Sequence, residues 1–223
     1  MVGKEDPRSP ALISWSGGKD SALALHNVSS KGRKILGLLT TLTSDFERIS
    51  MHGVRRSLLL AQGRALDLNL EEVWIPKDAT NTIYEKRFAE KVLKYRAPVI
   101  FGDLFLEDIR RYRENLFRRL GVRAEFPLWG RDTKKLAEQF IELGFGALVC
   151  TVDPRKLGWE FCGREFDYSF LRDLPEGVDP CGENGEFHTF VYKGPIFRIE
   201  IGVTRGEIVL RDGFYFCDIM PKR

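Results

Sequence analysis

The amino-acid sequence predicts an α/β protein, with a doubly wound parallel sheet followed by a smaller, mixed α/β C-terminal domain. Short apolar runs alternate with amphipathic segments through the first half of the 223 residues. Such continuously apolar strands are typical of a parallel sheet that helices cover on both faces. The last part of the chain instead reads as successive strands joined by turns. This change in character predicts a boundary near Pro127, with domains at 1–126 and 127–223.

The first domain is expected to alternate strands and helices in chain order. A strand at 11–15 leads into a helix that begins near 22–26. Strands at 35–41, 71–75 and 98–102 then alternate with helices at 52–66, 82–95 and 106–120. Right-handed crossovers between parallel strands place these helices on both faces of the sheet.

The second domain is expected to be mixed. The pattern continues through 126–129 into a helix near 133–143 and a strand at 147–152, and a loop-rich stretch covers 153–185. The remaining strands are predicted at 187–192, 196–203, 207–211 and 214–219. The sequence Arg211-Asp212-Gly213 between the last two is a hairpin signal, because Asp-Gly favours the tight turns that join antiparallel strands.

Residues 16–21, Ser-Gly-Gly-Lys-Asp-Ser, lie between the first apolar strand and the first helix. The glycines let the backbone approach an anion closely, and the turn amides and the positive end of the helix then face a phosphate. Lys19 adds a positive charge, and Asp20 can hold Mg²⁺ directly or through water. The pattern therefore predicts a phosphate-binding loop.

The loop lacks the spacing of a Walker A motif, and no G-x-G-x-x-G fingerprint follows the strand. It resembles the pyrophosphate loop (PP-loop) of the N-type ATP pyrophosphatases. That resemblance implies cleavage of ATP between its α and β phosphates, giving AMP and pyrophosphate, with ATP and Mg²⁺ as cofactors. The simpler alternative is a glycine turn, capped by Ser or Asp, that only begins a helix.

The fold rule and the motif point to the same place. In doubly wound sheets, ligands bind beyond the carboxyl ends of the strands. The PP-loop, the stretch 40–52 and residues 102–103 should converge there. The predicted ATP-binding residues are Ser14, Ser16, Gly17, Gly18, Lys19, Asp20, Ser21, Thr40, His52, Gly102 and Asp103, with Asp20 also the predicted metal ligand.

A second unusual stretch, 179–189, packs acids, an amide, an imidazole and a hydroxyl around two glycines. A turn needs Gly and Asn but not the additional charged groups. Glu186 and His188 should point the same way on the following strand, because side chains alternate with a period of two. We predict a polar pocket for an amine, ammonia or a carboxamide, with catalytic Glu183, Glu186 and His188 and substrate-binding Asn184 and Thr189. The alternative is an acidic turn with a solvent-facing histidine.

Composition narrows the class of protein. The formal net charge is only +3, which does not by itself indicate a nucleic-acid partner. No apolar stretch reaches 18 residues and residues 1–10 are polar, so we expect neither a membrane span nor a secretory signal. The four cysteines form no C-x-x-C pair, which fits free thiols in a reducing cytoplasm. A zinc site from Cys162, Cys181 and His188 stays an alternative, although its spacing fits no common pattern.

The helix at 106–120 is rich in arginine and could, with Arg55 and Arg56, bind an anionic partner such as RNA. We favour a solvated helix face instead, because Glu107, Asp108 and Glu114 stand at pairing distance along the helix. The side expected to be buried comprises Leu106, Ile109, Leu116 and Leu120.

These motifs together resemble the diphthine–ammonia ligase family over nearly the whole chain. They are the PP-loop, Ser50-Met51-His52, Gly102-Asp103, Pro127-Leu128-Trp129 and the Gly-Glu-x-Gly-Glu block at 182–186. The resemblance implies an N-terminal domain of the HUP-like, adenine nucleotide alpha hydrolase type. Asn184 and His188 replace a Gly and a Glu of the family block, so the chain looks closer to an uncharacterised, bacterial-type branch.

The family resemblance also implies a reaction in diphthamide synthesis. Its members adenylate the carboxylate of diphthine, a modified histidine on a translation elongation factor, and ammonia then displaces AMP. We therefore predict a cytoplasmic, ATP-dependent, amide-forming ligase that uses ATP, ammonia and an unidentified carboxylate acceptor. The alternatives are a tRNA-modifying ATP pyrophosphatase and a non-catalytic adenine nucleotide-binding protein. The sequence leaves a homo-oligomer open.

Overall fold

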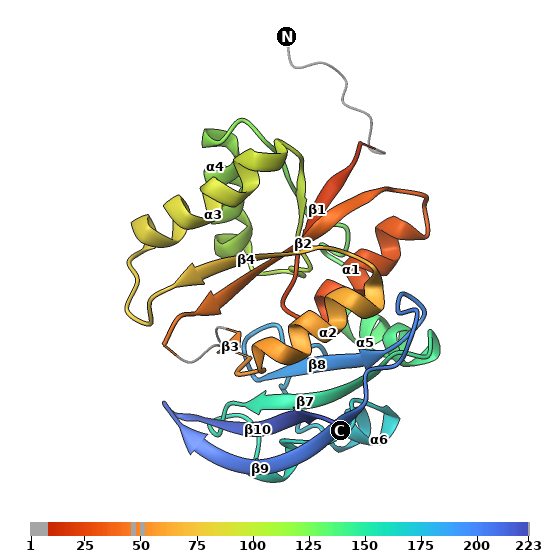
Figure 1. Cartoon of the computed structure of the whole chain (residues 1–223). Helices are drawn as coiled ribbons and strands as arrows, with labels where there is room; N and C mark the ends of the chain where they lie inside the picture. The colour runs from red at the N-terminus through yellow and green to blue at the C-terminus, as the bar shows by residue number, and fades with distance from the viewer. Residues whose placement is uncertain (1–8, 46–47, 50–51, 223) are drawn as a thin grey trace.

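The computed structural model describes residues 9–45, 48–49 and 52–222, which form two β-sheets with helices between and around them (Figure 1). The first sheet, sheet A, contains six strands, and the second, sheet B, contains four. Figure 1 shows the sheets one above the other, with α1 (Lys19–Ser29) and α2 (Arg56–Leu66) in the layer between them.

Sheet A has the strand order β4-β2-β1-β5-β6, and each neighbouring pair is parallel. Its strands are β1 (Ala11–Ser14), β2 (Ile35–Thr43), β4 (Leu70–Ile75), β5 (Val99–Ile100) and β6 (Ala124–Glu125). A short β3 (Arg48–Ile49) pairs antiparallel with the end of β2. The chain therefore builds outward in one direction from β1, then returns to build on its other side. This is the predicted doubly wound sheet, and the prediction is confirmed.

Helices cover both faces of sheet A because its strands are apolar on both sides. Leu12 and Leu39 pack in one cluster with residues of α3 (Asn81–Tyr95) and α4 (Glu107–Arg119). Ile13 and Leu38, their neighbours along β1 and β2, pack in the other cluster with α1 and α2. Successive strand residues point to opposite faces, which explains this division.

Sheet B has the order β8-β7-β10-β9 and is antiparallel throughout. Its strands are β7 (Gly146–Val152), β8 (Phe187–Lys193), β9 (Val203–Arg211) and β10 (Phe214–Pro221), accompanied by α5 (Thr133–Glu142), the 3₁₀ turn η1 (Trp159–Phe161) and α6 (Tyr168–Asp173). Asp212 and Gly213 have φ of 49° and 82°, so the predicted two-residue hairpin turn is present.

Two local predictions were wrong. The second helix begins at Arg56 rather than near residue 52, because Gly53 adopts a φ of 64° in a turn closed by the Val54 carbonyl. The stretch 153–185 is loop-rich as expected, with the short η1 and α6 inside it. Residues 196–202 form no strand. The Arg198 amide donates to the Ala65 carbonyl of α2 at 2.7 Å instead of to a neighbouring strand, and Ile196 and Phe197 pack against the core.

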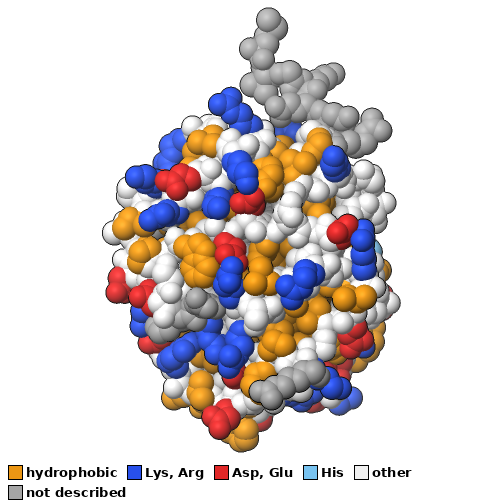
Figure 2. Space-filling model, in the orientation of Figure 1, with side chains coloured by type: hydrophobic (Ala, Val, Ile, Leu, Met, Phe, Trp, Pro, Cys, Tyr) orange, Lys and Arg blue, Asp and Glu red, His pale blue; other side chains and the backbone are white. Residues whose placement is uncertain are grey.

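The exposed face of α4 also differs in detail from the prediction. Leu116 is buried as expected, but Ile109 is 41% exposed and Phe117 takes a core position. The expected ion pairs form between Arg111 and both acids of the first turn, and between Arg110 and Glu114. Elsewhere on the molecule, basic and acidic side chains are interspersed on the face shown in Figure 2.

Candidate active site

A cavity of about 480 Å³ lies at the carboxyl ends of β1 and β5, where the strand order of sheet A reverses. This switch point is where doubly wound sheets bind their ligands. The loops after β1 and β5 form one side of the cavity, and the start of β8 in sheet B forms the other. Segments separated by more than 160 residues therefore meet at one site.

The PP-loop is built by its own residues. Gly17 has a φ of 77°, and Gly18 stands in extended conformation as the N-cap of α1. The Ser21 hydroxyl donates to the Gly18 carbonyl at 2.9 Å, and the Gly18 amide donates to the Ser16 hydroxyl at 3.3 Å. A Cβ at position 17 would meet the Gln62 side-chain oxygen at 2.8 Å, so conformation and space both require glycine there.

Strand β8 holds this loop from the side of sheet B. The Val191 amide donates to the Gly17 carbonyl at 2.9 Å, and the Lys19 amide donates to the Thr189 hydroxyl at 3.0 Å. The buried amide of Gln62 bridges the two segments, because it donates to the carbonyls of both Gly17 and Val191. The loop and sheet B are therefore one hydrogen-bonded unit.

Lys19 is buried, with 2% of its surface exposed. Its ammonium donates to Asp20 Oδ2 at 2.9 Å and to the backbone carbonyl of Cys181, and it lies 5.3 Å from the centre of the Phe187 ring. Burial alone would lower the pKa of Lys19, but the nearby carboxylate of Asp20 and other negative groups raise it overall. Lys19 is therefore a fixed positive charge at the floor of the cavity.

Asp20 provides the carboxylate oxygen best suited to a metal ion. Its Oδ1 atom is buried and has no hydrogen-bond partner among the described residues. Mg²⁺ is commonly held by one or two carboxylates together with substrate phosphates, so this single oxygen beside a phosphate loop fits it. No group of three or more His, Cys, Asp or Glu that could hold a metal occurs within residues 9–45, 48–49 and 52–222. The four cysteines are buried and free.

Glu183 projects into the cavity from the second predicted segment. Its Oε1 atom accepts a hydrogen bond of 2.7 Å from the Leu104 amide. Burial raises the pKa of Glu183 to about 7, and the negative charges of Asp20 and Asp103 act in the same direction. A carboxyl group with this pKa can both accept and release a proton near neutral pH.

His188 and His52, which line the same cavity as Glu183, form a ring pair with centroids 4.4 Å apart. Burial lowers the pKa of His52 to about 4 and holds that of His188 well below its usual range; the positive charge of Lys19 adds to both effects. The Nε2 atom of His188 is buried and has no hydrogen-bond partner among the described residues. Two neutral imidazoles therefore face the cavity.

Glu186 has a different place from the one that the period of two predicts. It precedes β8, is 2% exposed and does not line the cavity. Its Oε1 atom accepts hydrogen bonds from the Asp179 amide at 3.2 Å and the Asn184 side chain at 2.9 Å. In this arrangement Glu186 and Asn184 hold the turn together, and Glu183 is the acid that faces the cavity.

The loop after β5 closes the cavity against the PP-loop. A Cβ at Gly102 would meet the backbone of Asp20 at 2.7 Å, so glycine allows the two loops to touch. Asp103 is paired with Arg113 of α4 at 2.6 Å, and the Arg113 guanidinium lies 4.2 Å from the centre of the Phe101 ring. Arg113 and Tyr84 line the cavity, although sequence reasoning assigned neither to the site. No local sequence pattern signals this placement of Arg113, because it depends on the tertiary contacts with Asp103 and Phe101.

The structure brings most of the predicted site residues to this cavity. Those that line it are Ser14, Ser16, Lys19, Asp20, Ser21, His52, Gly102, Asp103, Glu183, His188 and Thr189. Gly17, Gly18, Thr40, Asn184 and Glu186 do not line it, and Thr41 lines it in place of the buried Thr40. Ser50 and Met51 lie outside the described residues. No helix within the described ranges has the length and apolar character of a membrane span.

Comparisons with known proteins identify similar sequences across the chain. The diphthamide synthase N-terminal domain matches residues 9–124, and the diphthamide synthase C-terminal domain matches residues 132–222. The diphthine–ammonia ligases of Rattus norvegicus and Homo sapiens are each 26% identical over 95% of this chain and 88% of their own length. The ligase of Schizosaccharomyces pombe is 25% identical over 93% of this chain, which spans 38% of that longer protein.

A solved structure gives a weaker likeness. It is described as a predicted subunit of tRNA methyltransferase from Methanocaldococcus jannaschii. It covers 86% of this chain and 100% of its own, at 15% identity and a TM-score of 0.43.

Proposed function

This chain belongs to the diphthamide synthase family, and we propose that it is an ATP-dependent ligase that forms a carbon–nitrogen bond in diphthamide synthesis. One observation carries the proposal: the PP-loop and the segment around Glu183 and His188 line a single cavity. A loop suited to pyrophosphate and a set of proton-accepting groups are what adenylation followed by amide formation requires. The curated relatives named diphthine–ammonia ligase support the same reaction.

In the first proposed step, a carboxylate oxygen of a diphthine-type acceptor attacks the α phosphorus of ATP. The bond to the β-phosphate bridging oxygen breaks, and pyrophosphate leaves with that electron pair. The buried ammonium of Lys19 and the amides at the start of α1 stabilise the negative charge that develops on pyrophosphate. Asp20 would hold Mg²⁺, which supplies further charge neutralisation for the phosphates when bound.

In the second proposed step, ammonia attacks the acyl carbon and AMP leaves. Glu183 accepts a proton from the attacking nitrogen, because its pKa of about 7 leaves a large ionised fraction at neutral pH. His188, held neutral beside His52, offers the unpartnered Nε2 atom as a hydrogen-bond acceptor for an N–H group. Thr189 fixes the loop through the Lys19 amide.

Further predictions stand beside this mechanism. Residues 1–126 would bind ATP and residues 127–223 would bind the acceptor and ammonia. A cytoplasmic location, a homo-oligomer and a place in a bacterial-type branch also stay predictions.

The experiment combines the protein with ATP, Mg²⁺, ammonium and elongation factor 2 that carries diphthine. AMP, pyrophosphate and the mass of the factor are measured together. We expect equal amounts of AMP and pyrophosphate, and a mass change on the factor that matches replacement of a carboxylate by a carboxamide. Omission of ammonium should stop amide formation.

Three other results would each overturn a part of the proposal. ADP and phosphate as products would show that the PP-loop does not direct cleavage at the α phosphate. AMP release that needs tRNA and leaves the elongation factor unchanged would favour a tRNA-modifying pyrophosphatase. Binding of ATP without any products in the complete mixture would favour a nucleotide-binding protein.

A further inference from the structure

A second cavity of about 490 Å³ adjoins the 480 Å³ cavity of the candidate active site, here called the ATP cavity, and has no role in the steps above. It lies between the ends of β2 and β4 on one side and the β9–β10 hairpin of sheet B on the other; we call it the hairpin chamber. Thr41, Ile49 and Tyr84 line both the chamber and the ATP cavity. The two spaces therefore meet along a common wall.

The hairpin side of this chamber is anchored to the first domain. Gly53, at a φ of 64°, lies so close to the Phe216 ring that a Cβ there would approach it to 2.6 Å. Asp218 accepts hydrogen bonds from Arg48 at 3.2 Å and from Arg55 at 2.6 Å. Close packing and two partly buried ion pairs fix β10 against β3 and the start of α2. The chamber is therefore a built space between the two sheets.

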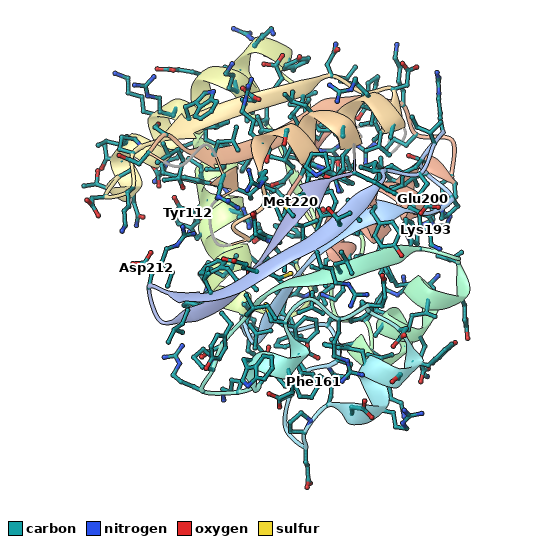
Figure 3. All side chains as sticks on the ribbon, turned by 60° about the horizontal axis from the view of Figure 1, so that its bottom comes forward. Tyr112, Phe161, Lys193, Glu200, Asp212 and Met220 are labelled. Atoms are coloured by element: carbon teal, nitrogen blue, oxygen red, sulfur yellow. The ribbon has the colours of Figure 1, made fainter. Side chains whose placement is uncertain are left out.

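The walls of the hairpin chamber combine aromatic rings with a basic rim. Phe214, Phe216 and Tyr84 supply the rings. Arg211 lies 5.0 Å from the centre of the Phe216 ring. Lys77 faces Asp212 across 3.7 Å, and both side chains are at least half exposed, so this pair contributes little and can rearrange around a ligand. Figure 3 shows Asp212 at the projecting tip of the hairpin.

Adenylation needs two reactants with their reacting atoms in contact. Small-molecule sites commonly have volumes of about 300–1,000 Å³, so each cavity suits one reactant. Correct placement of two bound reactants accounts for much of the rate gain in such reactions. With ATP in the first cavity, an acceptor in the second could bring its carboxylate to the common wall at Thr41 and Tyr84.

We infer that the hairpin chamber binds the acceptor of the proposed ligase, namely a carboxylate at the end of a stem that carries an aromatic ring and belongs to a protein. This inference rests on the proposed function. The aromatic walls fit a flat ring, the common wall at Thr41 and Tyr84 lets the carboxylate reach the first cavity, and the exposed mouth between Lys77 and Asp212 lets the stem remain attached to a larger body.

Two stable mimics of the acyl-adenylate test the inference. Both are 5′-O-sulfamoyladenosines; one carries an acetyl group and the other a 4-(imidazolyl)butanoyl group. Their dissociation constants are measured by calorimetry, alone and in competition with ATP. The chamber predicts that the imidazolyl mimic binds the wild-type protein at least about tenfold more tightly than the acetyl mimic, because only its ring reaches the aromatic walls.

Two variants locate that gain in the hairpin chamber. Asn81→Trp fills the chamber from the exposed start of α3, and Phe214→Ala removes one wall; neither residue lines the ATP cavity. We expect both to abolish the tenfold gain and to leave ATP and the acetyl mimic within about twofold. The matched controls are Lys86→Trp, exposed on the same helix, and Leu210→Ala, exposed on the same hairpin. Both controls should keep the gain.

The outcomes separate this inference from the proposed function. If the acetyl mimic displaces ATP but the imidazolyl mimic gains nothing, or its gain survives in both variants, the chamber is not the acceptor site. If neither mimic displaces ATP from a protein that binds ATP, the adenylation chemistry itself is wrong.

Discussion

The two halves of the candidate active site reach their geometry in different ways. The turn of the PP-loop at 16–21 is shaped by bonds within its own six residues and by the glycine conformation at position 17, and β8 and Gln62 then fasten the finished turn to sheet B. The segment at 179–189 folds into a turn, but its chemistry is set by residues far along the chain. Glu183 meets Leu104, and His188 meets His52.

This difference separates what a motif encodes from what tertiary structure decides. A loop that carries its own scaffold can be recognised from six letters, because each letter has a local physical task. The second segment contains three acids, Asp179, Glu183 and Glu186, and the local sequence does not distinguish which of them faces the cavity. Only the packing of sheet B against sheet A turns Glu183 toward the cavity and leaves Glu186 inside the turn.

The largest expected effect is at Lys19, the charge that the PP-loop places on the cavity floor. Lys19→Ala should lower the rate of AMP formation by about 100- to 1000-fold, because it removes a buried donor for the leaving pyrophosphate. Rapid-quench measurement of AMP gives the rate, and circular dichroism checks the fold. Lys31→Ala, an exposed lysine just after the same helix, is the control. A Lys19→Ala protein with normal turnover would refute the loop's role.

The next effect tests the second segment through pH. With the concentration of free ammonia held constant and Glu183 as the proton acceptor, kcat/KM should rise with pH and level off above about 7, because the carboxylate form is required. Glu183→Gln should lose about 100-fold and show no rise in that range. An unchanged pH profile in Glu183→Gln would transfer the proton-accepting role to another group.

The same pKa has a consequence for stability. Burial makes folded Glu183 hold its proton more tightly than the unfolded chain does, so its contribution is fully present below its ordinary pKa of 4.5 and is lost as the pH rises to about 7. Glu183→Gln should therefore gain stability relative to the wild type between pH 4.5 and 7. Urea unfolding of both proteins at pH 5 and pH 8 measures this difference; a constant difference would contradict the raised pKa.

A smaller effect separates Glu186 from Glu183. Glu186→Ala removes the acceptor for the Asp179 amide and the Asn184 side chain. These two donors would then be unsatisfied, so we expect a loss of about 1–3 kcal/mol in the free energy of unfolding. Glu183→Gln at neutral pH should keep most of its stability and lose activity. The opposite pattern would mean that the two acids have exchanged roles.

The sequence predicted the fold well where the pattern was periodic. The parallel strands, α3, α4 and the Asp212-Gly213 hairpin follow from apolar runs, helical spacing and turn chemistry. The failures lie where contacts outside the segment decide. Residues 196–202 carry strand-like apolar side chains, yet the Arg198 amide donates to Ala65 of α2 rather than to a neighbouring strand.

The site shows the same limit. Lys19 and Asp20 follow from the motif, whereas Arg113 was interpreted as part of an exposed basic face. Its placement in the cavity depends on Asp103 and on the Phe101 ring, which no local pattern brings together. Thr40 and Thr41 could not be told apart because the face that each presents depends on the register of β2.

The smallest expected effect compares one glycine from each region. Gly17 and Gly185 both have positive φ, 77° and 83°, so alanine strains the backbone at each. A Cβ at Gly17 also meets the Gln62 oxygen at 2.8 Å, whereas nothing lies within 4 Å of one at Gly185. Gly185→Ala should therefore cost only about 1 kcal/mol, and Gly17→Ala should cost more and also weaken ATP binding, because Gln62 joins the loop to β8. Thermal unfolding without ATP measures the loss of stability in each variant, and the further stabilisation that ATP gives measures how well each variant binds it. Equal losses in the two variants would show that the PP-loop tolerates a shift of Gln62. Phosphate binding would then not require the rigid attachment of the loop to sheet B.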